Sequence, residues 1–355
     1  MKKYLTGLGT LVVLLGLYLL FWPVPIDPDA WTPMPGPDLK GIYDPNRHLD
    51  KVQLIPIGDG SGPEDVAVDR QGRVYAGLRD GRIIRISTDD SQPETFADVE
   101  TRVLGLHFDA RDNLIVCAND KGLLSIAPDG TVTVLSTEQG GRPFRFVDDV
   151  DIAQDGTIYF SDASFKFSFK NTLDDLMEHR PNGRLLAYDP KTKATRMLLD
   201  KLYFANGVAV SPDQTFVLVN ETGAYRTMRY WLQGERKGQA EIFIDNLPGF
   251  PDGVSAGGKE TFWLALVSPR KTDVDSLLMP RPYLRKVLMR LPEAIRPKAE
   301  NYAFVLGLDR EGNVTHNLQG PDATIVQISS VQEHEGMLYL GSLVGSAIGR
   351  LPAPP

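Results

Sequence analysis

Apolar and polar side chains alternate over short runs through most of the chain beyond about residue 45. Turns made of Asp, Gly, Pro and Gln separate these runs, and helical periodicity is rare. Alternation with a period of two is typical of half-buried strands, whereas a helical pattern repeats about every 3.6 residues. We therefore predict that the body of the protein, residues 46–355, is all-β.

One strand–turn–strand unit recurs along this body. Each copy joins two apolar strands through a polar turn, as in "NGVAVSPDQTFVLVNE", and the copies begin at residues 63, 104, 148, 206, 252 and 328. Repeats of about 40–50 residues are typical of propeller blades, and the last interval is longer because residues 270–301 carry an insertion. Six such units predict a six-bladed β-propeller. A β-sandwich or two smaller β domains is the alternative.

Two segments depart from the repeat and are predicted to be short helical insertions. The first is "NTLDDLMEHR" at 171–180, and the second spans 279–298. In the second, four apolar residues share one helical face: Leu284, Val287, Leu288 and Leu291. Three basic residues face elsewhere: Arg285, Lys286 and Arg290. We expect a lid over the propeller mouth, a basic surface helix that contacts anionic lipid, or a helix packed on the propeller rim.

The N-terminal segment has a different character. No charged residue lies between Lys3 and Pro23, and about 20 apolar residues suffice to cross a bilayer. The run is longer than most signal-peptide cores and lacks a small-residue cleavage site. We predict an uncleaved transmembrane signal anchor at 1–22 and a proline-rich linker at 23–45, with a cleaved signal peptide as the alternative. The acidic body would then be extracytoplasmic, in a periplasm or a lumen.

Net charge and cysteine content exclude several classes of partner and of binding site. The formal net charge is −8 and the pI is about 5.3, which argues against nucleic acid as a partner. The single cysteine, Cys117, excludes an intramolecular disulfide, a thiolate zinc cluster and an iron–sulfur site. The sequence also lacks the G-x-S-x-G, H-E-x-x-H and P-loop motifs.

Aligning the copies on their first strand places oxygen-bearing side chains at one repeat position. Glu64, Asp148, Asn206 and Asp252 occupy it in four copies, and Leu104 occupies it in the second. Equivalent positions of successive blades are related by rotation about the channel, so these side chains are expected to converge. Three carboxylates and an amide would repel one another there without a cation. Oxygen donors suit Ca²⁺, with Mg²⁺ or Mn²⁺ as alternatives.

Several stretches resemble a known family. "GPEDVAVD", "ANGVAVSPD", residues 220–254 and "VQEHEGMLYLGSLVGSAIG" are similar to the strictosidine synthase-like branch of the gluconolactonase superfamily, nearest to its adipocyte plasma membrane-associated protein-like members. The resemblance covers almost the whole chain. It implies a six-bladed propeller with a central calcium, and often hydrolysis of lactones, aryl esters or related esters.

The resemblance also assigns individual residues. The family's metal ligands fall on Glu64, Asn206 and Asp252, and on Asp148, where the family usually has asparagine. Asp149 is expected to interact with these ligands rather than with the metal. Leu104, His107 and Ser329 are predicted to border the substrate pocket.

Two departures limit what the resemblance implies about the reaction. Strictosidine synthases use a catalytic glutamate at the position of Ser329, so condensation of an amine with an aldehyde is not expected. Paraoxonases use a histidine at the position of Leu104, so their histidine pair is absent.

These observations lead to two hypotheses. The first is a membrane-anchored, Ca²⁺-dependent hydrolase of small lactones or aryl esters. The cation would polarise the carbonyl, and Asp252 or Asp148 would serve as general base or nucleophile. The second is a non-enzymatic module that binds a ligand or a protein, in which calcium has a structural role and stabilises the central channel.

Overall fold

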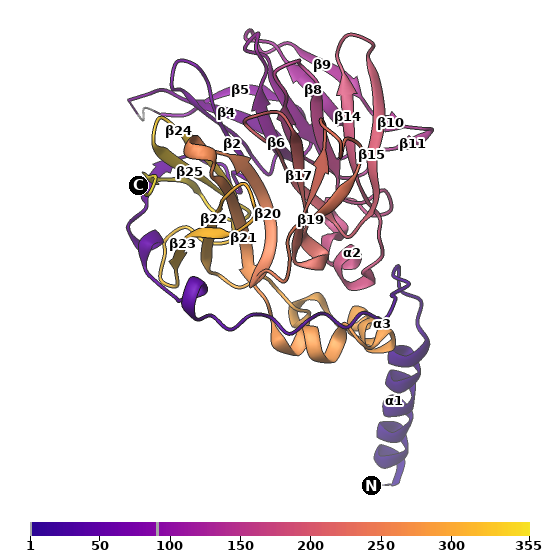
Figure 1. Ribbon diagram of the computed structural model, residues 1–355. Helices are drawn as coiled ribbons and strands as arrows, with labels where there is room; N and C mark the ends of the chain where they lie inside the picture. Colours follow the sequence, from indigo (N-terminus) through magenta and orange to yellow (C-terminus); the bar gives the residue numbers. More distant parts are fainter. Residues whose placement is uncertain (1, 90–91) are drawn as a thin grey trace.

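The structure is a computed structural model that describes residues 2–89 and 92–355. Six four-stranded antiparallel sheets are arranged as blades around a central channel (Figure 1). The first strand of each blade is innermost, and these strands contact one another in a closed ring in the order β2, β6, β12, β16, β20 and β24. The predicted six-bladed propeller is confirmed.

Within each blade the strands follow the chain outward from the channel. Blade 1 contains β2 (Val66–Val68), β3 (Val74–Gly77), β4 (Arg82–Ile86) and β5 (Glu94–Asp98). Blade 2 contains β6 (Val103–Phe108), β7 (Leu114–Ala118), β8 (Gly122–Ile126) and β9 (Val132–Ser136). Blade 3 contains β12 (Val147–Ile152), β13 (Ile158–Asp162), β14 (Gly183–Asp189) and β15 (Ala194–Leu202). Blade 4 contains β16 (Ala205–Val210), β17 (Phe216–Glu221), β18 (Arg226–Trp231) and β19 (Ala240–Ile244). Blade 5 contains β20 (Gly249–Ala256), β21 (Phe262–Pro269), β22 (Ala303–Leu308) and β23 (Val314–Gly320). A small hairpin, β10 (Glu138–Gln139) and β11 (Arg142–Pro143), projects between blades 2 and 3.

The sixth blade combines both ends of the propeller sequence. It contains β24 (Ile328–His334), β25 (Met337–Ser342), β26 (Ala347–Pro352) and, from the N-terminal side, β1 (Gln53–Pro56). β1 pairs antiparallel with β26, and Ile55 in β1 is buried. This pairing closes the ring, because it joins the start of the propeller to its end.

The core lies between the blades, where the sheets pack face to face. The cluster between blades 4 and 5 is rich in aromatic side chains, including Phe216, Trp231, Phe243, Phe262 and Phe304. β16, β17 and β22 are buried along their whole length. Their apolar runs are therefore dictated by burial on both faces rather than by simple alternation.

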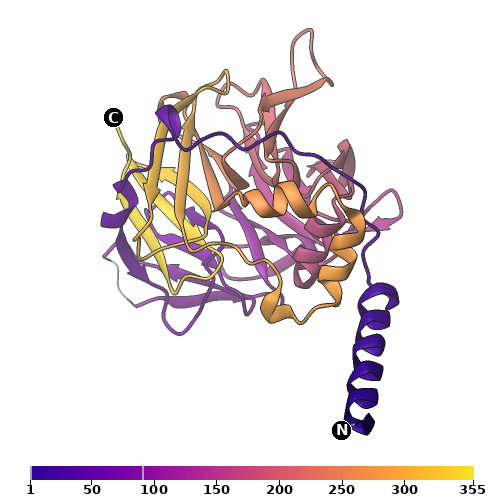
Figure 2. The same cartoon turned by 90° about the horizontal axis from the view of Figure 1, so that it is seen from below.

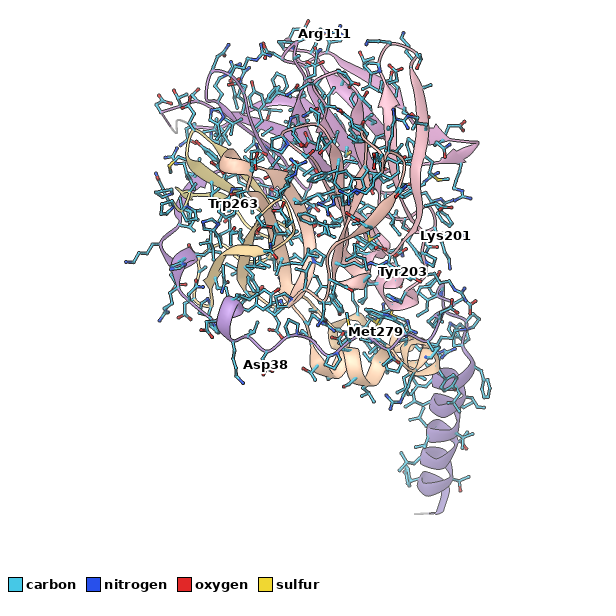
Figure 3. The ribbon with its side chains drawn as sticks, in the orientation of Figure 1. Asp38, Arg111, Lys201, Tyr203, Trp263 and Met279 are labelled. Atoms are coloured by element: carbon cyan, nitrogen blue, oxygen red, sulfur yellow. The ribbon has the colours of Figure 1, made fainter. Side chains whose placement is uncertain are left out.

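Both helical insertions form at one end of the propeller. They comprise α2 (Thr172–Glu178), a π-helical turn at Val274–Leu278, α3 (Pro282–Arg290) and a short turn at Glu293–Ile295. Figure 2 shows them crossing the face that is turned toward α1. Figure 3 places Met279 at this end and Arg111 at the opposite end.

The predicted character of the second insertion is partly wrong. Arg285 and Arg290, expected to face away from the apolar side, are buried, as is Met289. Arg285 is buried because its guanidinium donates to main-chain carbonyl groups of α2 and of the N-terminal segment. The helix is therefore held against the propeller rather than presenting a basic face.

The N-terminal segment forms α1 (Lys2–Phe21) followed by an extended strap that carries 3₁₀ turns at Gly41–Tyr43 and His48–Lys51. The strap is not a free spacer, since Ile26 and Tyr43 are buried against the propeller. Among the described residues, no helix is both long and apolar enough to cross a bilayer. The predicted transmembrane anchor is thus not supported, and Met1, where it would begin, lies outside the described residues.

Candidate active site

Five of the six innermost strands carry a β-bulge at the same point. The register shifts between Val103 and Leu106, and at the matching places of the other blades: 147/150, 205/208, 251/254 and 328/331. A bulge inserts a residue and changes the direction of the side chains beside it. The bulged positions include 148, 206 and 252, so three of the four candidate ligands lie where an inner strand departs from its regular pleat, while Glu64 lies just before β2.

Glycine is required at the second bulge position of three blades, at Gly105, Gly207 and Gly253. A Cβ on Gly207 would lie 2.4 Å from the carbonyl oxygen of Asp252, and one on Gly253 would lie 2.5 Å from that of Ser329. Neighbouring inner strands therefore approach too closely for a side chain. Gly253 thus allows the neighbouring inner strands to approach each other closely, in addition to forming the bulge with Asp252.

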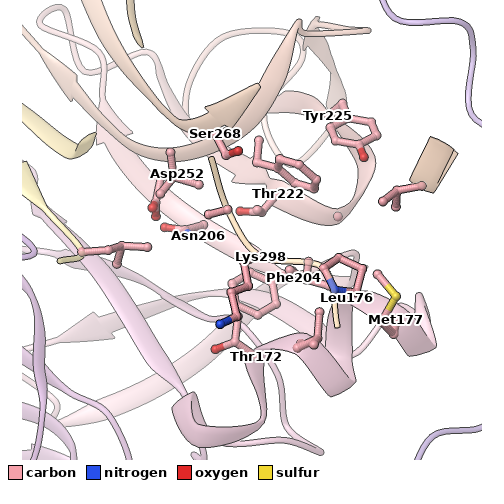
Figure 4. Close-up of a pocket in the computed structure, with 18 of the residues that line it drawn as sticks. Thr172, Leu176, Met177, Phe204, Asn206, Thr222, Tyr225, Asp252, Ser268 and Lys298 are labelled. Carbon is pink, nitrogen blue, oxygen red and sulfur yellow. The ribbon is translucent and has the colours of Figure 1, made fainter. Parts of the chain in front are cut away.

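The candidate ligands form the polar end of a cavity of about 310 Å³. Glu64, Asp148, Asn206 and Asp252 all line it, and each is buried. Figure 4 shows Asn206 and Asp252 side by side, facing the same space as Thr222 and Ser268. The predicted convergence of these four residues is observed.

The rest of the cavity is mainly apolar. Inner-strand and loop residues form its walls, and the helical insertions form its roof: Phe146, Phe169, Phe204, Phe250 and Val267, with Leu173, Leu176, Met177, Val274 and Met279 above them. The hydroxyl of Tyr225 donates to Oδ1 of Asp275 at 2.8 Å, which ties blade 4 to the roof. The cavity therefore combines an acidic end with a mainly apolar body, and Lys271 and Lys298 also line it.

Burial and mutual repulsion disfavour ionisation of the clustered acids. Burial raises the pKa of Asp148 well above its ordinary value, and the charges of Glu64, Asp252 and Asp149 raise it further. Burial and Glu64 likewise raise the pKa of Asp252, while a hydrogen bond from Asn206 lowers it. Such carboxylates become fully ionised only when positive charge is supplied.

Arg102 supplies part of that charge and was missed by the sequence analysis. Its Nε donates to Oε2 of Glu64 at 2.6 Å, and Nη2 donates to the same oxygen. The pKa of Glu64 is raised by burial and lowered by Arg102, with burial the larger effect. The available signal was a basic residue directly before the second inner strand, in "TRVLG".

The donor chemistry fits a hard divalent cation. The four residues offer carboxylate and amide oxygens, the ligands that Ca²⁺ prefers. Within the described residues, however, no three His, Cys, Asp or Glu side chains are gathered closely enough to hold an ion by themselves. The acids converge on one cavity without forming a closed cage.

Two of the predicted pocket residues support the wall from behind. Leu104 packs with Phe146 and Phe204, which line the cavity. Ser329 is buried, and its hydroxyl donates to the main-chain carbonyl of Glu64 at 2.6 Å. Both contribute to the position of the site but neither lines it, because each side chain is occupied by the packing between adjacent blades.

His107, also predicted to border the substrate pocket, lines a different cavity from the four oxygen-bearing residues. It lies three residues beyond Leu104 and lines a space of about 160 Å³ further along the inner strands, with Asp65, Asp149 and Asp151. Its Nε2 is 3.5 Å from Oδ1 of Asp151. The distance along the strand separates it from the acidic end of the larger cavity.

Asp149 acts on the candidate ligands through charge and through the backbone. Its carboxylate accepts hydrogen bonds from the main-chain N–H groups of Val150 and Val208, at 2.8 and 2.7 Å, and so links blades 3 and 4. Its charge also raises the pKa of Asp148.

Comparison with known proteins places these features in a family context. The family model for strictosidine synthase matches residues 148–235, and the model for the N-terminal region of strictosidine synthase-like proteins matches residues 41–86. Protein STRICTOSIDINE SYNTHASE-LIKE 6 of Arabidopsis thaliana is 37% identical over 312 residues, which cover 86% of this chain and 82% of that protein. Adipocyte plasma membrane-associated protein of Homo sapiens is 34% identical over 363 residues, which cover 96% and 86%.

Solved structures share the architecture at low sequence identity. A gluconolactonase from Xanthomonas campestris superposes with a TM-score of 0.62 at 17% identity, covering 93% of this chain and 97% of its own. Regucalcin from Agrobacterium tumefaciens, described as a calcium-binding protein, superposes with a TM-score of 0.58 at 14% identity, covering 82% and 92%. At these identities the likeness shows the fold alone.

Proposed function

The chain belongs to the strictosidine synthase-like family, and we propose that it is a Ca²⁺-dependent hydrolase of lactones or aryl esters that have an apolar body. The convergence of Glu64, Asp148, Asn206 and Asp252 at one end of an apolar cavity carries this proposal. A gluconolactonase and a calcium-binding protein among the structural neighbours are consistent with it.

The cavity orients such a substrate by polarity. Phe146, Phe169 and Phe204 enclose the apolar part of the molecule, whose burial contributes about 25 cal/mol for each Å² removed from water. The polar ester or lactone group is then directed to the acidic end, where hydrogen-bonding partners are available. Substrates without an apolar body would gain little from this cavity.

The four oxygen-bearing residues would hold the cation, and Mg²⁺ or Mn²⁺ could take the place of calcium. When bound, the cation supplies Lewis acidity that polarises the carbonyl and stabilises the developing oxyanion. Asp148 is the better candidate for general base, because Asp252 already accepts a hydrogen bond from Asn206. In that role Asp148 would interact with the cation through water rather than bind it directly. Asp148 takes a proton from the attacking water and returns it to the departing alkoxide.

Condensation of the strictosidine synthase type is not proposed. Ser329 stands where the resemblance places the catalytic glutamate, and its hydroxyl is committed to the carbonyl of Glu64. A buried serine in this position offers neither a carboxylate base nor a side chain that lines the cavity.

The proposal is tested by hydrolysis assays on the purified full chain. We expect hydrolysis of aryl esters and lactones in calcium, loss with EDTA, and recovery when calcium is restored. Asp148→Asn and Asp252→Asn should each lower kcat/KM at least about 100-fold. Asp200→Asn, on the exposed outer strand of blade 3, is the matched control. Activity that survives EDTA and both site variants would contradict the proposal.

A non-enzymatic ligand-binding role is the second candidate. The observation that favours it is the roof, which covers an apolar cavity of a size suited to a small ligand. In this case apolar fluorescent probes would bind with calcium present and no ester would be cleaved. The same substrate panel therefore decides between the two functions.

We also propose that α1 associates the protein with a lipid membrane. Its apolar side chains are exposed on several sides, among them Leu8, Leu11, Val12 and Leu15. One relative is named for association with a plasma membrane. Fractionation should place the full chain with membranes after a high-salt wash, and deletion of residues 2–21 should release it. Recovery of the full chain in the soluble fraction would refute this role.

A further inference from the structure

Two basic side chains line the cavity apart from its acidic end. They are Lys271, where the chain leaves β21, and Lys298, where it returns toward β22. The part of the chain that the structure describes places no other basic residue in the cavity wall. Figure 4 shows Lys298 and Thr172 on one side of this space and Asn206 and Asp252 on the other. Groups of opposite charge therefore lie at different places in one cavity.

The pairing of β20 with β21 shows how the lysines are separated from the acids. Asp252 lies in the bulge of β20, beside the pair formed by Pro251 and Leu266. From Leu266, β21 continues to Pro269, three residues or about 10 Å further at the usual rise of a strand. Lys271 follows at the start of the insertion. An apolar body can therefore span the space between the acidic end and the lysines.

The ammonium of Lys298 is available to a ligand. Lys298 is exposed, and it forms no hydrogen bond or ion pair among the described residues. Lys271 is partly engaged, since its Nζ lies 3.5 Å from Oε1 of Glu300. Glu300 does not line the cavity, and its main-chain N–H donates to Oγ of Ser268 at 2.9 Å. This ion pair holds Lys271 at the base of the insertion.

The exposure of the two lysines places them at the mouth of the cavity. The side chain of Lys271 is 27% exposed, and Lys298 is more exposed. An exposed lysine often lies along apolar surface and directs its charge into water. Here, however, two lysines from opposite ends of one insertion border the same mainly apolar space. A charge beside apolar walls attracts an entering anion more strongly than the same charge on an open surface.

We propose that Lys271 and Lys298 are specificity-determining residues that bind an anionic group at the far end of the substrate. The preferred substrates are then lactones or esters whose apolar body carries a negative charge. The reacting carbonyl lies at the acidic end and the anionic group lies at the mouth. Because an ammonium acts as a point charge, carboxylate, sulfate and phosphate groups are all suitable. The inference rests on the proposed function and narrows its substrate class.

A binding experiment tests this role without relying on catalysis. The probes are cis-parinaric acid, a fluorescent fatty acid with a carboxylate, and the corresponding uncharged alcohol, each titrated onto the full chain in calcium. The acid should bind at least about fivefold more tightly than the alcohol, the upper range for a partly exposed ion pair. In Lys271→Gln combined with Lys298→Gln, the two probes should bind within about twofold of each other. A carboxylate that bound a cation at the acidic end instead would keep its advantage in this variant.

Three further variants serve as controls. Lys271→Arg combined with Lys298→Arg keeps both charges and should keep the preference for the acid. Lys170→Gln combined with Lys191→Gln removes two exposed charges that do not line the cavity, and should change the preference by less than about twofold because distant exposed charges are screened. Lys298→Gln alone changes an exposed side chain without a partner among the described residues, so folding is not at risk. It should lower the preference at least about twofold.

Hydrolysis connects the lysines to the reaction. The substrates are the mono-4-nitrophenyl ester of sebacic acid, which has a free carboxylate at its far end, and the methyl ester of that compound. The wild type should cleave the aryl ester of the charged substrate with a kcat/KM at least about fivefold higher. The double glutamine variant should cleave the two equally.

The outcomes separate the two claims. If both probes bind the wild type but the acid has no advantage, or keeps it in the double glutamine variant, the role of the lysines is refuted and the proposed function stands. If the advantage is lost in that variant but neither ester is cleaved, the lysines bind an anionic ligand and the proposed hydrolysis is refuted. If neither probe binds, ligand binding in this cavity is refuted, and the role of the lysines with it.

Discussion

Nη1 of Arg285 donates a hydrogen bond of 2.8 Å to the main-chain carbonyl of Met177. This contact joins α3 to α2, although the two residues are more than 100 positions apart in the chain. The same guanidinium also donates to the carbonyl of Asp29 in the N-terminal strap. One fully buried arginine thus joins α3 and the N-terminal strap to α2, and α2 lines the cavity.

Loss of this arginine should loosen the roof. In Arg285→Gln at least two charge-assisted hydrogen bonds are removed, and we expect a loss of about 3 kcal/mol in the free energy of unfolding. The strap at 23–35 should also become more sensitive to limited proteolysis. Lys286→Gln is the control, because Lys286 forms an exposed ion pair with Asp27. Equal effects of the two substitutions would show that Arg285 has no special role.

Gly253 should tolerate no side chain. In Gly253→Ala the new Cβ would meet the main-chain oxygen of Ser329 at 2.5 Å, and blades 5 and 6 would have to separate. We expect a loss of more than about 2 kcal/mol, measured by chemical denaturation. Gly36→Ala is the control, since its Cβ would meet only the flexible side chain of Arg270, at 3.4 Å or more. A stable Gly253→Ala protein would contradict the close approach of the inner strands.

Filling the apolar part of the cavity should change substrate preference. Leu176 lies in the roof and lines the cavity, so Leu176→Trp should raise KM at least about tenfold for aryl esters with a long acyl chain. Acetyl esters should be affected much less, because they reach only the acidic end. Met197→Trp, at an exposed position of blade 3, is the control. An equal change for short and long substrates would argue against binding in this cavity.

Asp175 should make stability depend on pH. It is buried in α2 and accepts hydrogen bonds from Ser164 at 2.5 Å and from Asn182 at 3.1 Å, and burial raises its pKa to about 7. Because the pKa is higher in the folded than in the unfolded state, its contribution to stability is greatest below about pH 4 and falls as the pH rises to about 7.

Asp175→Asn removes this dependence. Relative to the wild type, the variant should gain on the order of 3 kcal/mol between pH 4 and pH 8, measured by denaturant unfolding at each pH. Asp200→Asn controls for the substitution itself. A difference between Asp175→Asn and the wild type that stays constant with pH would refute the role of Asp175.

The propeller could be predicted because its physical cause is local and repeated. Each copy of the strand–turn–strand unit carries its own alternation and turn residues, so six copies indicate six blades without knowledge of any long-range contact. The set Glu64, Asp148, Asn206 and Asp252 could be predicted for the same reason. Because the blades are related by rotation about the channel, side chains at the same position of different repeats point to the same region of the channel.

The remaining features depend on contacts that no repeat encodes. Arg102 pairs with Glu64 across two blades, and Arg285 is buried only because α2 and the strap bring carbonyl groups to it. His107 lines a separate cavity because three residues along a strand move a side chain to another level of the channel.

The sequence by itself therefore determined the number of blades, the repeat position of the site and the oxygen chemistry of its donors. Only the tertiary structure decided which basic residue pairs with Glu64 and which segments close the cavity. The reason is that desolvation and ion pairing depend on which groups meet once the chain has folded, whereas alternation and repetition are properties of the chain itself.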